Sequence, residues 1–288
     1  MDEDICKVFI VKQTVLVMGA SGMLGHKMVQ VLSKEFNVFG TTRVTSTDSN
    51  IIGGVRADNM ESVRRAIKQC LPDVIVNCIG IIKQLPEAND PLTAISVNAL
   101  FPHKLARVCK QNDIRLIHIS SDCVFSGKKG YYTEIDQSDA EDLYGRSKYL
   151  GEVYYPGCLT IRTSIIGREL HSSNGLLEWF IKNKNGVVSG YANVRFSGLT
   201  TLELSCVVGK IIKSYFMLTG LYHVSSSSID KNDLLHLINS EYKLNITINP
   251  EYDIKNNRSL DSSKFMHDTD IKIPSWKQMI SDMHKDVI

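Results

Sequence analysis

Residues 14–25 read TVLVMGASGMLG, an apolar run that passes directly into a glycine-rich turn. Residues 14–18 have the composition of a buried strand, and an amphipathic helical pattern that includes Met28 and Leu32 follows the turn. Glycines in this arrangement allow a tight turn, close approach of backbone to a pyrophosphate, and close packing of helix on strand. The free N–H groups at the start of the helix also favour phosphate. The stretch therefore predicts the first strand, phosphate-binding turn and helix of a dinucleotide-binding fold.

The rest of the first half of the chain alternates strand and helix patterns, as a doubly wound sheet requires. Further strands are expected at residues 37–42, 73–79, 114–120 and 159–163, and helices through residues 64–67, 92–111 and 144–148. The continuously apolar run at 73–79 is typical of a parallel strand buried on both faces. We therefore expect an α/β fold with a Rossmann-type, doubly wound parallel sheet.

The pattern loosens after Gly167 into shorter segments, with helices expected near 202–217 and 231–241 and after Pro274. We expect an NAD(P)-binding domain over residues 13–167, preceded by an extension over residues 1–12. Residues 168–288 are expected to form mainly a smaller substrate-binding lobe, from which some segments return to the sheet.

A candidate catalytic group begins where the strand 114–120 ends. Ser121 follows this strand, and Tyr144 and Lys148 come later, four residues apart on an expected helix, where their side chains share one face. A free phenol, with a pKa of about 10, is a poor acid–base catalyst at neutral pH. The ammonium is therefore expected to lower the pKa of the phenol, and Ser121 to hold the substrate oxygen. The three side chains predict a proton-transfer unit.

Composition and charge argue against a nucleic-acid-binding protein and a membrane protein. The 288 residues are 43% apolar and 22% charged with a net charge of +2, and the dispersed basic residues favour neither a nucleic acid nor a membrane surface as partner. No apolar stretch reaches membrane-spanning length, and the start of the chain lacks the features of a signal peptide. Seven cysteines without a Cys-x-x-Cys pair and eight histidines without metal-ligand spacing indicate reduced thiols, no metal site and a cytoplasmic protein.

Several motifs together give the chain a family resemblance. They are Gly19-x-x-Gly22-x-x-Gly25, PDVIVN at 72–77, SSDCVF at 120–125, Tyr144-Gly-x-x-Lys148-x-x-Gly-Glu152 and IRTS at 161–164. They resemble the extended short-chain dehydrogenase/reductase superfamily, and within it most closely the dTDP-4-dehydrorhamnose reductases and relatives that act on UDP-linked 6-deoxy-4-keto sugars. Segments 127–134, 190–198 and 258–261 are also similar, so the resemblance spans nearly the whole chain after residue 13.

The resemblance implies NAD(P)H-dependent reduction of the C4 keto group of a nucleotide-linked 4-keto-6-deoxyhexose, in deoxysugar biosynthesis for surface polysaccharide or glycans. It assigns Ser121, Tyr144 and Lys148 to catalysis. Cofactor contacts are implied for Gly19, Ser21, Gly22, Met23, Leu24, Asp58, Asn59, Cys78, Ile79, Gly80, Tyr144 and Lys148. Substrate contacts are implied or expected for Lys83, Ser121, Asp122, Cys123 and Arg258, the last of these on the nucleotide diphosphate.

The end of the second strand predicts the cofactor preference. NAD-specific sites place an acidic residue there to accept the ribose hydroxyls, whereas this chain has Thr41-Thr42-Arg43. An arginine favours a 2′-phosphate, so we expect NADPH to be used at least as well as NADH. His26 and Lys27 are candidates for additional contacts to the same phosphate.

Two departures from the family pattern leave the identity of the sugar substrate undetermined. The family often has Tyr where this chain has Cys123, and often Trp in the segment matching Ile165-Ile166. The base, dTDP or UDP, stays open, as does the product stereochemistry, and the segment 120–125 favours a UDP-2-acetamido-2,6-dideoxyhexulose. The oligomeric state is also open, with a homodimer as one expectation.

Alternative functions share the fold. A nucleotide-sugar 4,6-dehydratase typically carries an Asp-Glu pair where this chain has Asp122-Cys123, and a 4-epimerase usually has a longer C-terminal lobe. A non-catalytic regulatory subunit of the methionine adenosyltransferase type is the alternative from a different class, and the intact Ser121, Tyr144 and Lys148 argue against it.

Overall fold

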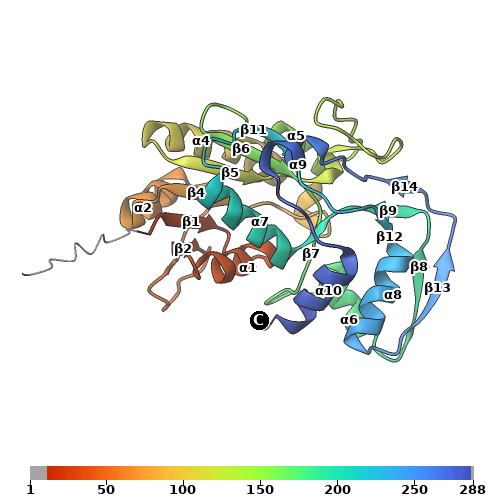
Figure 1. Cartoon of the computed structure of the whole chain (residues 1–288). Coiled ribbons are helices and arrows are strands. Elements are labelled where there is room, and N and C mark those ends of the chain that lie inside the picture. The colour runs from red at the N-terminus through yellow and green to blue at the C-terminus, as the bar shows by residue number, and fades with distance from the viewer. Residues whose placement is uncertain (1–11, 287–288) are drawn as a thin grey trace, which may run out of the picture.

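The computed structural model describes residues 12–286, so the expected extension lies almost entirely outside the described residues. Seven parallel strands form the central sheet in the order β11-β6-β5-β4-β1-β2-β3 (Figure 1). The strands are β1 (Thr14–Met18), β2 (Asn37–Thr41), β3 (Ile51–Ile52), β4 (Val74–Asn77), β5 (Arg115–Ile119), β6 (Cys158–Arg162) and β11 (Gly220–His223). The expected parallel sheet is confirmed. The strand order reverses between β1 and β4, and ligands bind at such a point in open sheets.

Helices cover both faces of the sheet. They are α1 (Met23–Leu32), α2 (Met60–Cys70), α4 (Phe101–Gln111), α5 (Leu143–Leu150) and α7 (Thr201–Ser214). Val15 and Val17 of β1 share a hydrophobic cluster with α1 and α7, while Leu16 and Met18 share another with α2 and α4. Alternate side chains of one strand thus enter opposite layers, because successive side chains of a strand point to opposite faces.

The expected helix over residues 92–111 is continuous but not uniform. It runs through α3 (Pro91–Ala94), a π-helical segment η2 (Ile95–Leu100) and α4. The amide of Asn98 in the π-helical segment accepts a hydrogen bond from the Ile81 backbone N–H at 2.8 Å and contacts the Ser147 hydroxyl at 3.3 Å. π-Helical turns often occur at functional sites. This one ties the loop after β4 to helix α5.

Two element boundaries differ from expectation. The strand β3 lies just after the expected polar loop and has only two residues, too few for a periodic pattern to reveal. Helix α7 ends at Ser214 rather than near Met217, because the Arg115 guanidinium binds the carbonyls of Ile211, Tyr215 and Leu218 and so satisfies the end of the helix.

Most of the remaining elements lie together at one end of the molecule, whereas the helix Ser263–Thr269 packs on β11 (Figure 1). The remaining elements are β7 (Ile165–Ile166), α6 (Leu176–Lys182), β8 (Val187–Tyr191), β9 (Val194–Phe196), β10 (Leu199–Thr200), β12 (Ile229–Asp230), α8 (Lys231–Tyr242), β13 (Thr247–Glu251), β14 (Asn256–Asn257), α9 (Ser263–Thr269) and α10 (Trp276–Lys285). The hydrophobic cluster of β1 and α1 continues into this lobe through Phe180, Leu234 and Trp276. The division at residue 167 stays a prediction, and from beyond it α7 and β11 lie in the sheet layers.

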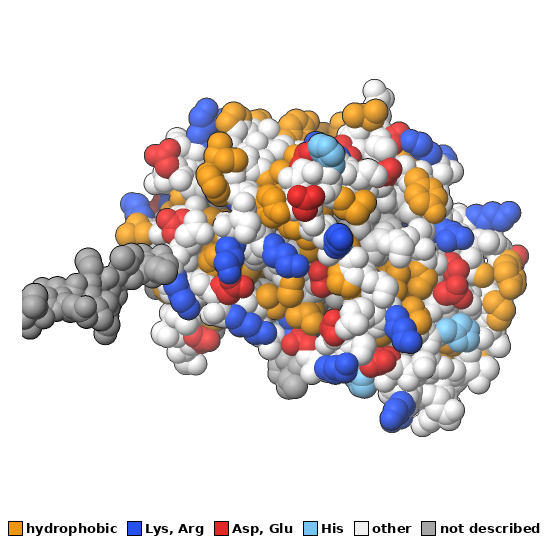
Figure 2. All heavy atoms as spheres, viewed as in Figure 1, with side chains coloured by type: hydrophobic (Ala, Val, Ile, Leu, Met, Phe, Trp, Pro, Cys, Tyr) orange, Lys and Arg blue, Asp and Glu red, His pale blue; other side chains and the backbone are white. Residues whose placement is uncertain are grey.

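The surface carries mixed charge. On the face shown in Figure 2, Lys and Arg side chains are interspersed with Asp, Glu and apolar side chains. Within residues 12–286, no helix is both long enough and apolar enough to span a bilayer.

Candidate active site

The glycine turn after β1 has the geometry that a pyrophosphate requires. Gly19 has a φ of +82°, and a Cβ added to Gly25 would lie 2.0 Å from the Gly19 carbonyl oxygen. Gly22 is the N-cap of α1 and provides no side-chain cap, so the first N–H groups of the helix remain available. Ser21 and Gly22 are exposed. The turn therefore fits the diphosphate of a dinucleotide.

The other residues implied for the dinucleotide lie around this turn. The Ile79 side chain would lie 3.1 Å from a Cβ on Gly19, and a Cβ on Gly80 would lie 3.8 Å from Lys148 Nζ. The loop after β4 therefore joins the glycine turn to the catalytic helix. Cys78 and Met23 are half-buried beside it, and Leu24 is buried in the core.

Three residues implied or expected near the ribose differ in what their side chains do. Arg43 is exposed just after β2, and makes no hydrogen bond or ion pair with the rest of residues 12–286. Asp58 pairs with Arg56 at 2.7 Å, and the Asn59 side chain caps α2 through the N–H groups of its first turn. The side chains of Asp58 and Asn59 thus bind other groups of the protein, whereas the exposed Arg43 side chain is available to bind a ligand.

Lys27 was expected to contact the 2′-phosphate, but its side chain points into the protein. Its side chain is buried and pairs with Asp286, which follows α10, because Lys27 lies on the face of α1 that packs inward. His26 Nδ1 lies 2.9 Å from the Gly22 carbonyl, and burial lowers the pKa of the imidazole. Arg43 remains the basic side chain best placed for a 2′-phosphate.

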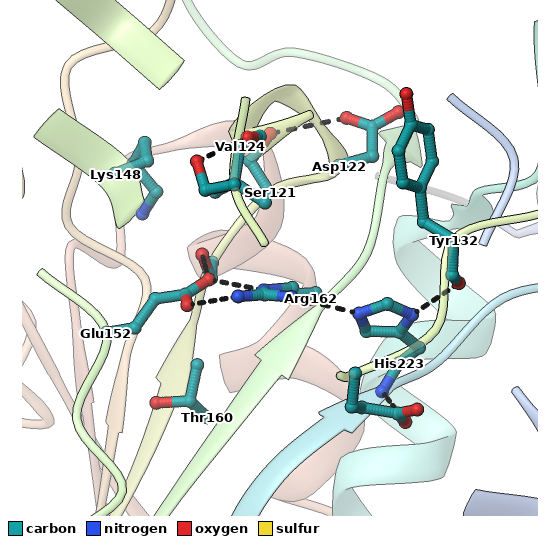
Figure 3. Close-up of polar contacts among 12 residues, drawn as sticks. Ser121, Asp122, Val124, Tyr132, Lys148, Glu152, Thr160, Arg162 and His223 are labelled. Atoms are coloured by element: carbon teal, nitrogen blue, oxygen red, sulfur yellow. Dashed lines mark hydrogen bonds and ion pairs between the residues drawn. The ribbon is translucent and has the colours of Figure 1, made fainter. Parts of the chain in front are cut away.

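Ser121, Tyr144 and Lys148 come together at the carboxyl end of the sheet. Ser121 follows β5 and is the N-cap of a short 3₁₀ helix, η3 (Asp122–Val124), where its hydroxyl accepts from the Cys123 N–H at 3.1 Å and donates to Asp122 at 3.3 Å. Lys148 is buried and donates to the Ile119 carbonyl at 2.9 Å. Tyr144 lies in the first turn of α5 and forms a hydrogen bond with Ser121. Figure 3 shows Ser121 and Lys148 in this region.

The electrostatics of the phenol differ from the expectation. Burial raises the pKa of Tyr144, with added contributions from Cys123 and Asp122, and only the hydrogen bond with Ser121 opposes the shift appreciably. Burial lowers the pKa of Lys148 to about 8, against the opposing influence of Glu152 and Cys78. The expected lowering of the phenol pKa by Lys148 is therefore not found, because burial dominates the shift and Lys148 is not among the groups that contribute to it appreciably. Tyr144 keeps its proton at neutral pH, as a proton donor must.

Two of the five expected substrate residues line a pocket of about 340 Å³ next to the catalytic group. Cys123, Asp142 and Arg258 line it, and Arg258 Nε donates to the Phe125 carbonyl at 2.7 Å. Lys83 reaches its edge through an ion pair with Asp142 at 2.6 Å. Burial raises the pKa of Asp122 while the nearby Arg258 opposes the shift. Cys123 and Arg258, both expected from the sequence to contact the substrate, thus line one pocket.

Reasoning from the sequence missed other basic residues. Lys231 begins α8, and burial lowers the pKa of its ammonium while the nearby Asp122 and Cys123 oppose the shift. Lys128, Arg195 and Lys255 line an adjacent pocket of about 600 Å³ that shares Ser126 and Lys128 with the first. Neither a motif nor a periodic pattern marks these residues, and only the fold gathers them.

A metal centre has no support in the described part of the chain, where no group of three or more His, Cys, Asp or Glu side chains is arranged to hold an ion.

Two curated proteins are among those similar to this chain. A dTDP-4-dehydrorhamnose reductase of Mycolicibacterium smegmatis is 30% identical over 166 residues, which are 55% of this chain and 47% of that protein. The spore coat polysaccharide biosynthesis protein SpsK of Bacillus subtilis is 30% identical over 227 residues, covering 75% of this chain and 74% of that protein. The chain thus spans about half the length of the first of these relatives and about three quarters of the second.

A solved structure has the same fold. The dTDP-4-dehydrorhamnose reductase of Bacillus anthracis, in complex with NADP, superposes with a TM-score of 0.82 at 21% identity, covering 95% of this chain and 99% of that chain. Residues 13–288 match the family described as the RmlD substrate binding domain. The chain therefore belongs to the RmlD substrate binding domain family.

Proposed function

We propose that this protein is an NADPH-dependent reductase of the C4 keto group of a dTDP- or UDP-linked 4-keto-6-deoxyhexose. The observation that carries the proposal is the assembly of Ser121, protonated Tyr144 and Lys148 between the glycine turn and the pocket at Cys123. Relatives named dTDP-4-dehydrorhamnose reductase, and a Streptomyces niveus relative named dTDP-4-keto-6-deoxy-D-glucose reductase, 34% identical over 138 residues, support it.

Cofactor binding follows from the free groups of the glycine turn. The uncapped first turn of α1 would hold the pyrophosphate, and the exposed Arg43 guanidinium would pair with the 2′-phosphate. When bound, NADPH supplies the hydride for the reduction. The NADP in the Bacillus anthracis structure supports the same choice of cofactor here.

The chain's own residues handle the proton. The raised pKa of Tyr144 keeps a proton on its hydroxyl, ready for the carbonyl oxygen as negative charge develops there. The Ser121 hydroxyl, whose bond to Asp122 is long at 3.3 Å, can turn to donate to the same oxygen. Lys148 stabilises the phenolate that remains. Positioned proton donation of this kind is worth roughly a hundred- to ten-thousand-fold in rate.

The two adjoining pockets suit the two halves of a sugar nucleotide. The pocket at Cys123 lies beside the proton donor and would take the hexose. The larger pocket, with Lys128, Arg195 and Lys255, would take the diphosphate and nucleoside, because cations hold phosphate oxygens through charge-assisted hydrogen bonds. Lys231 and Arg258 lie between the reacting centre and the diphosphate in this arrangement.

The cellular setting is part of the proposal. The six cysteines among the described residues are all free, which supports a reducing, cytoplasmic compartment. The homodimer stays a prediction.

Cofactor stoichiometry tests the proposed function. The protein is incubated with NADPH and a panel of dTDP- and UDP-linked 4-keto-6-deoxy sugars, and the products are identified by NMR. A reductase consumes one NADPH for each keto sugar, and leaves dTDP-glucose, UDP-glucose and UDP-N-acetylglucosamine unchanged because they have no carbonyl to reduce. A 4-keto product from any of those three, without net consumption of NADPH, would instead establish a dehydratase or epimerase. No turnover with any sugar, together with tight binding to another protein, would favour a regulatory subunit.

A further inference from the structure

A buried ion pair lies below the catalytic residues. Arg162, the last residue of β6, donates from Nε and Nη2 to the two carboxylate oxygens of Glu152, each at 2.7 Å, and both side chains are almost completely buried. Ser120 adds a third hydrogen bond, from its hydroxyl to Glu152 at 2.8 Å. Ser120 directly precedes Ser121, so the carboxylate holds the end of β5 that presents the catalytic hydroxyl. Figure 3 shows this arrangement.

The other side of the guanidinium contacts His223, at the end of β11. Arg162 Nη1 lies 3.3 Å from His223 Nε2, and His223 Nδ1 lies 2.9 Å from the Tyr132 carbonyl. Because a guanidinium only donates, Nε2 must accept and Nδ1 must carry the proton that binds Tyr132. Burial and the adjacent Arg162 lower the pKa of His223 to about 4, so the imidazole stays neutral.

Two aromatic rings continue this contact into the loop 125–134. The guanidinium of Arg162 lies 5.0 Å from the centre of the Phe125 ring, which stacks on Tyr132 at 4.0 Å. The Tyr132 hydroxyl accepts from the N–H groups of Gly127 and Lys129. Residues of this loop line both pockets. Arg162 therefore supports the substrate-binding side of the site through its contact with Phe125.

Stability alone does not account for such a pair. Burying two charges carries a desolvation cost that their attraction often only balances, so a well-packed neutral pair is frequently as stable or more stable. The contacts of this pair with Ser120 on one side and His223 and Phe125 on the other indicate a role in placing the site.

We infer that Glu152 and Arg162 are positioning residues of the reduction, which hold the catalytic end of β5 and the substrate loop 125–134 in one fixed arrangement. This inference rests on the proposed function. It adds that the buried pair of Glu152 and Arg162 links the position of the hexose pocket to the position of the proton donor. Neither side chain is proposed to touch the substrate.

The negative charge of Glu152 also raises the pKa of Lys148, so removing that charge should change how activity depends on pH. The charged and titratable groups facing Lys148 are Glu152 after α5, Cys78 after β4 and His118 on β5, with Tyr144 on its own helix. Burial raises the pKa of Cys78 to about 12 and lowers that of His118, so both are neutral near pH 8, and Glu152 is the charge that favours the ammonium. Activity that needs the Lys148 ammonium falls as pH rises through its pKa. Without the Glu152 charge, that fall must begin at lower pH.

The experiment compares the wild type with the paired variant Glu152→Gln/Arg162→Met, which removes both charges and leaves no unpaired ion in the core. We expect a folded protein with kcat lowered by about tenfold or more and KM raised, since small misplacements of reacting groups are costly. The fall of activity with pH should begin at lower pH, and amide hydrogens of residues 127–132 should exchange faster with solvent. Arg115→Met is the matched control, because it removes a part-buried guanidinium from the opposite end of β5.

A lowered thermal midpoint in the paired variant, with kcat, pH profile and exchange as in the wild type, would overturn the positioning role. If the paired variant does not fold, Ser120→Ala removes a single hydrogen bond to Glu152, and it should lower kcat severalfold in a protein that stays folded; an unchanged kcat would overturn the inference. Hydrogen exchange does not depend on turnover. A wild type without reductase activity would therefore overturn the proposed function, and the exchange of residues 127–132 in the paired variant would still decide the positioning role.

Discussion

The Tyr144 hydroxyl is the single group on which the proposed chemistry depends. Its raised pKa means that the phenol is protonated throughout the physiological range, which suits reduction, where the substrate oxygen must gain a proton. The pKa shift thus leaves Tyr144 in the form that can give a proton to the substrate oxygen.

Replacing Tyr144 tests this role directly. Tyr144→Phe should lower kcat by roughly a hundredfold or more, since positioned proton donation is worth at least that much. Affinity for NADPH should change little, because the lost hydroxyl points to the substrate oxygen. Steady-state kinetics and cofactor titration by fluorescence measure the two effects separately. Full activity in Tyr144→Phe would exclude the phenol as donor.

Arg43 is the residue that we propose to decide between NADPH and NADH. Arg43→Asp should shift the ratio of kcat/KM for NADPH over NADH towards NADH by roughly tenfold to a hundredfold, the worth of a hydrogen bond to a charged group. The aspartate would repel the 2′-phosphate and accept hydrogen bonds from the ribose hydroxyls. The wild-type ratio is the control. A wild type that strongly prefers NADH would show that Arg43 has no role in binding the cofactor.

At the scale of elements, the contact of helix α1 with the glycine turn sets the cofactor site. Gly25 lies within α1, and its lack of a side chain is what lets the helix pack on the Gly19 carbonyl. The π-helical segment that carries Asn98 has a similar effect on the far side, where it holds the loop after β4 against α5. Close backbone packing at Gly25 and the side-chain hydrogen bonds of Asn98 thus bring separate elements to one edge of the sheet.

A methyl group at Gly25 would separate the helix from the turn. Gly25→Ala places a carbon 2.0 Å from the Gly19 oxygen, so the backbone must move, and we expect a loss of about 1–3 kcal/mol in unfolding free energy. NADPH affinity should fall with it. Gly209→Ala in α7 is the control, because its new carbon would meet only the end of the Leu32 side chain at 3.2 Å. Equal NADPH affinity in Gly25→Ala and wild type would show that the turn tolerates displacement.

At the scale of the whole molecule, one hydrophobic cluster runs from the sheet into the lobe. Strand residues such as Val17 and Ile161 share it with Leu234 of α8 and Trp276 of α10. The ion pair of Lys27 with Asp286 joins the start of the sheet to the end of the lobe. The sheet and the lobe are therefore expected to unfold together rather than as separate units.

Unfolding measured by two probes tests this cooperativity. Both tryptophans, Trp179 and Trp276, lie in the lobe, so their fluorescence reports on the lobe while far-UV circular dichroism reports on the whole chain. The two denaturant transitions should coincide, and NADPH should shift both to higher denaturant by the same amount. Separate midpoints, with only the dichroism responding to NADPH, would show an independent lobe.

The sequence by itself determined what depends on local pattern. The strand, glycine turn and helix at 14–25, the parallel sheet, and the family were all predicted from residues close together in the chain, because side-chain period and turn chemistry act over a few residues. The tertiary structure alone decided which distant groups meet. It turned Lys27 inward, brought Arg195 to a pocket and Lys231 near Asp122, joined Glu152 to His223 through Arg162, and reversed the expected pKa shift of Tyr144. Burial and long-range charge set these properties, and both depend on neighbours that the chain order does not reveal.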